Sequence, residues 1–128
     1  MVTVNKILLV GTGGFLGAIS RYLSVYYITQ YTNVKTFPIG TMIVNISGCF
    51  LLGFWFGIAI SKEMISPEVR LLFFTGFLGS FTTYSTFGVE SFNLLKDGNH
   101  IGAVFNIFIH VAAGLAAVWS GDMISKSF

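Results

Sequence analysis

The stretch GSFTTYSTFGVE, residues 79–90, lies inside an apolar segment that is long enough to cross a membrane. It combines two glycines, five serine or threonine hydroxyls and three aromatic rings, and it ends in a carboxylate. Polar groups at membrane depth are costly, so they normally face other protein groups or a water-filled path. This segment is therefore expected to have a role beyond spanning the bilayer.

The composition of the whole chain indicates a membrane protein. Of the 128 residues, 54% are hydrophobic and only 9% are charged, whereas about 25% of the residues in a soluble domain are charged. A membrane-spanning helix needs roughly 20 apolar residues. We predict an all-α integral membrane domain over residues 1–128, with four spans at roughly residues 7–28, 38–60, 69–95 and 101–121.

Several other interpretations of the sequence are weaker. The first twenty residues could pass for a signal peptide, but three more apolar segments follow, so we assign them to the first span. The run GTGGFLG has Leu16 where a dinucleotide fingerprint has its third glycine, and no strand precedes it. Cys49 is the single cysteine and is interpreted as a small packing residue. We expect neither enzymatic activity nor a nucleic-acid partner.

The third segment, 69–95, is too long for a straight span. About 27 residues make an ideal helix about 40 Å long, and the apolar core of a bilayer is about 30 Å thick. A break near Gly76, Gly79 and the run SFTT would absorb the excess. Broken membrane helices expose backbone carbonyls, which suit a small hard cation. We therefore predict that the third helix is broken within the membrane.

Polar residues recur at helical spacing in the second and fourth spans. Thr41, Asn45 and Gly48 share one face of the second span, and Asn106 and His110 share a face of the fourth. Asn45 serves either as glue between helices or as pore lining, and the sequence leaves both open. For His110 the alternative to a functional role is a buried neutral ring satisfied by a neighbour.

Two aromatic residues and several glycines add to this pattern. Tyr84 and Phe87 share a helix face, and the electropositive edges of aromatic rings attract anions, although rings at this spacing also simply pack. Small residues four apart let helices approach closely in lipid. They occur at Gly13 and Gly17, Gly53 and Gly57, and Gly98 and Gly102. They serve packing within one subunit, and we expect a homodimer to use them as well.

The positive charges barely define an orientation. With four spans, one side of the membrane holds Lys6, Lys62, Arg70 and Lys126, and the other holds Arg21, Lys35 and Lys96. Lysine and arginine asymmetry normally sets topology. The near balance favours dual topology, in which copies insert both ways up. The alternative is a weakly biased protein that other signals orient.

Three motifs resemble the small bacterial fluoride channels, the Fluc or CrcB family. They are GGFLGAISRY (13–22), GTMIVNISGCFLLG (40–53) and GFLGSFTTYSTFGVE (76–90). The resemblance implies an antiparallel, dual-topology homodimer in the bacterial inner membrane that passively exports fluoride. It also implies a structural Na⁺ at the dimer interface, held by backbone carbonyls of Gly79 and Thr82.

The same resemblance implies a set of pore residues. They are Thr41, Asn45, Tyr84, Ser85, Thr86 and Phe87, with Arg21, Glu90, Asn106 and His110 as candidates for the pore or its vestibules. The sequence departs from the family pattern where Tyr84 replaces a phenylalanine, and where Asn106 and His110 replace a tyrosine and a serine.

Two rival functions belong to other classes. A proton-coupled small multidrug exporter would need an acid in the first span, and residues 7–28 contain none. A non-transporting membrane assembly subunit would use the polar residues only to hold helices together, so substitutions there would change stability and not ion flux.

Overall fold

The computed structural model describes residues 2–62 and 65–128, and every regular element in these ranges is a helix. Three helices are long and apolar enough to span a membrane, so the chain is an all-α membrane protein. They are α1 (Val4–Thr32), α2 (Ile39–Lys62) and α6 (His100–Ser125). Shorter elements connect α2 to α6: α3 (Pro67–Val69), the π-helix η1 (Arg70–Leu78), α4 (Gly79–Phe81) and α5 (Tyr84–Lys96).

Helix α1 continues past residue 28, where the first span was predicted to end. Near its end, the hydroxyl of Thr32 donates to the carbonyl of Ile28 over 2.8 Å, which satisfies this polar side chain locally. The helix ends at Asn33, whose left-handed φ of 53° places its N–H on the Thr29 carbonyl. In the second predicted joint, residues 63–64 lie outside the described residues.

The segment formed by α3 and η1 starts with a regular N-cap and then changes from α-helical to the wider π-helical geometry. Ser66 accepts a hydrogen bond from the Val69 N–H, and Pro67 occupies the first turn, where its missing N–H costs nothing. From Arg70 the helix has π geometry, with hydrogen bonds to the fifth residue. The rings of Phe73, Phe77 and Phe81 stack nearly parallel along this stretch, with centroids 5.6 and 6.0 Å apart.

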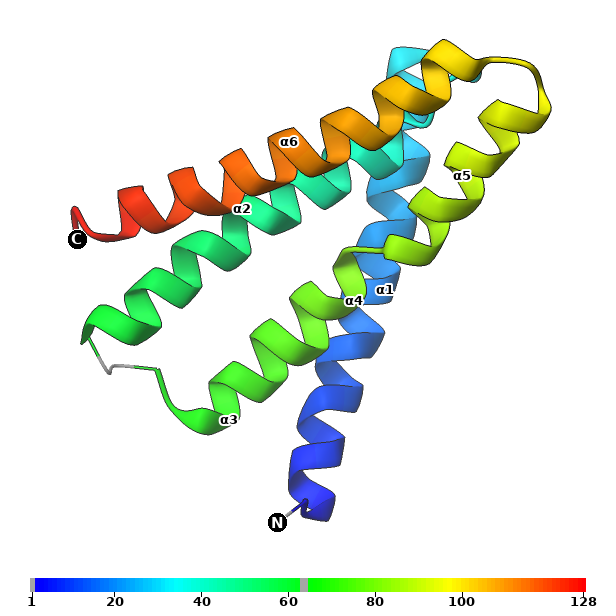
Figure 1. Cartoon of the computed structure of the whole chain (residues 1–128). Helices are drawn as coiled ribbons and strands as arrows, with labels where there is room; N and C mark the ends of the chain where they lie inside the picture. Colours follow the sequence, from blue (N-terminus) through cyan, green and yellow to red (C-terminus); the bar gives the residue numbers. More distant parts are fainter. Residues whose placement is uncertain (1, 63–64) are drawn as a thin grey trace.

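Glycines allow two helix pairs to pack closely. Helices α2 and α6 lie side by side (Figure 1), and a Cβ on Gly53 would collide with the Val118 carbonyl. Helix α1 packs against η1, where a Cβ on Gly17 would collide with the Phe77 carbonyl. Both contacts are within one subunit. The third predicted pair was wrong, because Gly98 lies in the turn before α6 with a φ of +76°.

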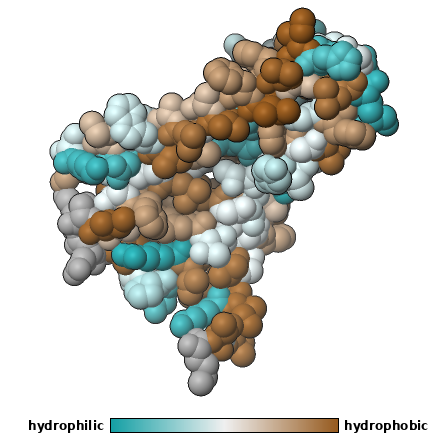
Figure 2. Space-filling model, in the orientation of Figure 1, coloured by the Kyte–Doolittle hydropathy of each residue, from teal (hydrophilic) through white to brown (hydrophobic). Residues whose placement is uncertain are grey.

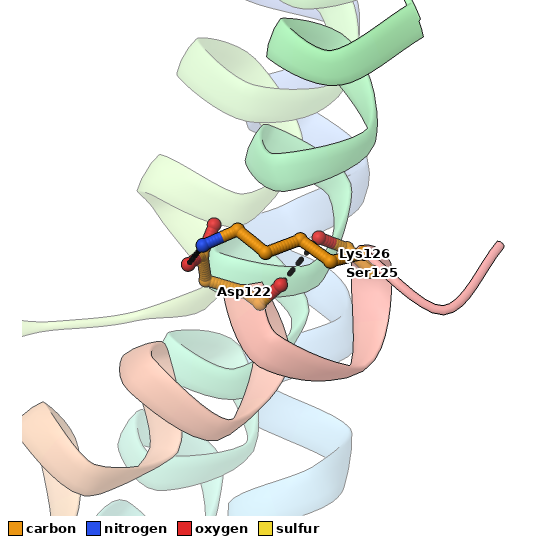
Figure 3. A network of polar contacts seen from close by, with 3 residues as sticks. All are labelled: Asp122, Ser125 and Lys126. Atoms are coloured by element: carbon orange, nitrogen blue, oxygen red, sulfur yellow. Dashed lines mark hydrogen bonds and ion pairs between the residues drawn. The ribbon is translucent and has the colours of Figure 1, made fainter.

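The surface of the single chain is largely apolar. Figure 2 shows hydrophobic atoms along the body, with hydrophilic patches mainly towards its ends. Many large apolar side chains are exposed, among them Phe15 on α1 and Phe108 on α6, each 66% exposed. One hydrophilic end is the last turn of α6 (Figure 3), where Lys126 pairs with Asp122 over 2.7 Å. Such a surface suits lipid or a second subunit.

Candidate functional site

The site is built around two residues that interrupt the helix between α4 and α5. Thr82 and Thr83 have extended backbones, with ψ angles of 156° and 119°. The predicted polar face of α2 lies against this interruption. Asn45 hydrogen-bonds Thr83, the Cβ position of Gly48 lies against the Thr82 side chain, and Thr41 donates to Glu90 over 2.7 Å.

Asn45 holds the backbone of Thr83 at both ends. Its Nδ2 donates to the Thr83 carbonyl over 3.0 Å, and its Oδ1 accepts from the Thr83 N–H over 2.8 Å. A helix interruption leaves backbone groups that need hydrogen-bond partners in an apolar medium. Asn45 is the partner of two such groups, the N–H and the carbonyl of Thr83. One of the two amide hydrogens of Asn45 remains for another acceptor.

The interruption deprives backbone carbonyls of their regular donors, and those of Gly79 and Thr82 are among them. In a continuous α-helix the N–H groups of Thr83 and Thr86 would reach the carbonyls of Gly79 and Thr82, four residues earlier. Here the Thr83 N–H binds Asn45, and the Thr86 N–H binds the Thr83 hydroxyl over 3.3 Å. The carbonyls of the two predicted sodium ligands are therefore among those that lack their helical donors at the interruption.

A cavity of about 280 Å³ opens on one side of the interruption. Phe87 lies between two other rings there, with centroid distances of 5.7 Å to Tyr84 and 4.5 Å to His110. Tyr84 is 83% exposed. The cavity is lined by Asn45, Cys49, Leu52, Thr82, Thr83, Tyr84, Phe87, His110 and Val111. Aromatic side chains and residues with amide or hydroxyl groups thus line one small space.

A second cavity of about 500 Å³ lies on the other side. Arg21 of α1 and Glu90 of α5 both line it, together with Thr41 and Thr86. Thr83 lines both cavities. Thr83, at the interruption, is therefore part of the wall of both hollows.

The hydroxyl groups beside the interruption form a connected cluster. Thr83 donates to the Thr86 hydroxyl over 3.1 Å, and its hydroxyl lies 3.3 Å from that of Ser85. Thr83 also caps α5. It is absent from the residues predicted for the site, although a threonine three residues before another polar residue is a helix-start signal.

Asn106 lies apart from the two cavities. Its side chain is fully buried and donates to the Ser91 hydroxyl over 2.9 Å, while Ser91 donates to the Phe87 carbonyl over 2.8 Å. Asn106 thus joins α6 to the helix that carries Phe87. His110, one turn later, reaches the smaller cavity. Ser91 was not predicted, because nothing in the sequence pairs it with Asn106.

The chain resembles known proteins over nearly its whole length. One relative, from Chlorobium chlorochromatii, is 44% identical over 120 residues, covering 94% of this chain and 92% of the relative. Another, from Methanococcus aeolicus, is 41% identical over 124 residues, covering 95% and 96%. Both are named fluoride-specific ion channel FluC. Residues 8–122 match the family described as CrcB-like protein, Camphor Resistance (CrcB), and the chain belongs to that family.

Proposed function

We propose that this protein is a fluoride-specific channel that lets fluoride leave the cytoplasm passively across the bacterial inner membrane. The observation that carries the proposal is the pair of cavities that share Thr83 in their walls, one of them lined also by Phe87 and Asn45. The names of the relatives supply the ion.

The mechanism replaces the water around fluoride with protein donors. The remaining amide hydrogen of Asn45 and the hydroxyls of Ser85 and Thr86 donate hydrogen bonds. The edges of Phe87 and Tyr84 complete the shell without a fixed positive charge. A larger halide fits this narrow space less well, so selectivity follows from size and donor placement.

The working unit is an antiparallel homodimer of four-span subunits in which the interruption at Thr82–Thr83 lies within the membrane. The broad apolar surface of the single chain supports a partner as well as lipid. The near balance of lysine and arginine supports insertion in both orientations. A dimer of this symmetry brings two copies of the interruption close to one axis and contains two pores.

A structural Na⁺ at that axis fits the residues present. The carbonyls of Gly79 and Thr82 have lost their helical donors, and hard carbonyl oxygens suit a small cation. The Gly79 and Thr82 carbonyls of both subunits would hold the ion. When bound, it supplies a fixed positive charge that offsets these partial negative charges.

Fluoride efflux from liposomes tests the function. We expect the purified wild-type protein to release fluoride, measured with a fluoride electrode, and to retain chloride in a parallel experiment. Equal release of both anions, or drug efflux with no fluoride efflux, would overturn the proposal.

A matched pair of variants tests the role of the ring edges. Phe87→Ile removes the ring and keeps an apolar side chain, so we expect fluoride efflux to fall at least tenfold, or about 1.4 kcal/mol. Phe92→Ile is the control, because Phe92 is 60% exposed on the same helix and lines neither cavity. Wild-type efflux from Phe87→Ile would exclude the ring-edge mechanism.

A further inference from the structure

The hydrogen bonding of His110 determines which ring nitrogen can act on an ion. Its Nδ1 lies 2.9 Å from the backbone carbonyl oxygen of Asn106. A carbonyl only accepts hydrogen bonds, so Nδ1 must carry the proton. In the neutral ring, Nε2 then has a lone pair and no hydrogen. This Nε2 is buried and has no hydrogen-bond partner among the described residues.

The ring that carries this nitrogen lies at the proposed anion path. His110 lines the cavity of about 280 Å³ together with Asn45 and Phe87, and its ring lies 4.5 Å from that of Phe87. A neutral His110 offers an anion only a lone pair, which repels it. A protonated His110 offers a second N–H donor and a positive charge, which attract it.

We propose that His110 binds the permeating fluoride only as an imidazolium, so that protonation of this one residue controls the rate of conduction. The inference rests on the proposed function and adds a proton requirement to it. The proton stays on the ring, and no bond is made or broken. Because binding is reciprocal, fluoride in the cavity also favours the protonated ring.

Few other titratable groups face His110. Across the cavity they are the Cys49 thiol on α2 and the Tyr84 phenol on α5. Free thiols and phenols lose a proton only in alkaline solution. Glu90, also on α5, hydrogen-bonds Thr41 and lines the larger cavity instead. Because Glu90 borders the other cavity of the proposed path, the His110 variants are needed to assign a change in flux to the imidazole.

The sign of the effect follows from the charge of each form. Acidification produces the imidazolium, so flux rises as pH falls. We expect wild-type fluoride efflux to increase severalfold as the medium is acidified from neutral pH, after subtraction of the leak from protein-free liposomes at each pH.

Two histidine variants make the test specific. In His110→Gln, an amide provides a permanent donor near the place of Nε2, so efflux should persist and become independent of pH. His100→Gln is the matched control, because His100 is exposed at the start of α6 and lines neither cavity. It should keep the wild-type profile. His110→Ser, a smaller permanent donor, replaces His110→Gln if that variant does not fold.

The outcomes separate this inference from the proposed function. Fluoride efflux that is absent at every pH overturns the proposed function. Efflux that is present but has the same profile in wild type and His110→Gln overturns the role of His110 alone. A flat wild-type profile overturns it as well, without reference to any variant.

Discussion

Asn45 both holds the interrupted helix and lines a cavity. Its two hydrogen bonds to Thr83 make it glue, and its place beside Phe87 makes it cavity lining. The hydrogen bonds agree with the interpretation as glue between helices, and the pore-lining interpretation stays a prediction.

The residue-scale prediction concerns that double role. Asn45→Ala leaves the N–H and the carbonyl of Thr83 without partners, and each unsatisfied buried group costs about 1–3 kcal/mol. We expect lower thermal stability in detergent and loss of fluoride efflux. Ser47→Ala is the control, because Ser47 only donates to the nearby Val44 carbonyl. Equal stability of the two variants would show that Asn45 does not hold the interruption.

At the scale of elements, glycines determine how closely helices approach. Gly11 and Gly17 lie on the same helix, but their surroundings differ. A Cβ on Gly17 would collide with the Phe77 carbonyl, whereas nothing lies within 4 Å of a Cβ on Gly11. The contact between α1 and η1 therefore depends on Gly17 and not on glycine content as such.

Alanine substitutions at these two positions should have opposite effects. Gly17→Ala forces α1 away from η1, and overpacking typically costs about 1–3 kcal/mol. Gly11→Ala instead gains helix propensity of up to about 1 kcal/mol. Thermal unfolding of the two variants in the same detergent measures both. A Gly17→Ala protein as stable as Gly11→Ala would mean that α1 and η1 are not packed at this point.

The positions of helices and of the break could be predicted from the sequence where they depend on a local property of the chain. Apolar length located α2 and α6, and the extended residues Thr82 and Thr83 lie within the SFTT run, where a break was predicted to absorb the excess length of the third segment. Hydrogen bonds between residues that are distant in the chain could not be predicted from the sequence. The bond from Asn106 to Ser91 is an example, because no spacing rule links two polar residues on different helices.

At the scale of the whole molecule, the lysine and arginine tally predicts how copies insert. Side-specific reporters fused to the C-terminus should both be active in wild type if orientation is mixed. Asn33→Lys with Thr36→Lys adds positive charge between α1 and α2, and should silence one reporter. The same positions changed to Gln should leave both active. A wild-type protein with a single active reporter would exclude dual topology.

Removal of sodium tests the proposed centre of the dimer. Exchange of Na⁺ for a larger organic cation on both sides of the liposome should leave the carbonyls of Gly79 and Thr82 without a counter-charge. We expect fluoride efflux to fall about tenfold or more, which corresponds to about 1.4 kcal/mol, and to return when Na⁺ is restored. Undiminished efflux in the organic cation would contradict a structural role for the ion.

The two hydrogen bonds between Asn45 and Thr83 also impose an order on the folding of the newly made chain. The two residues are 38 positions apart. The hydrogen bonds that hold the interruption therefore cannot form until both residues have left the ribosome and α2 has packed against α5. The segment from Arg70 onward therefore first enters the membrane without the hydrogen bonds from Asn45. These bonds form only when α2, which is synthesised earlier, packs against the segment, so the interruption is stabilised late in biogenesis.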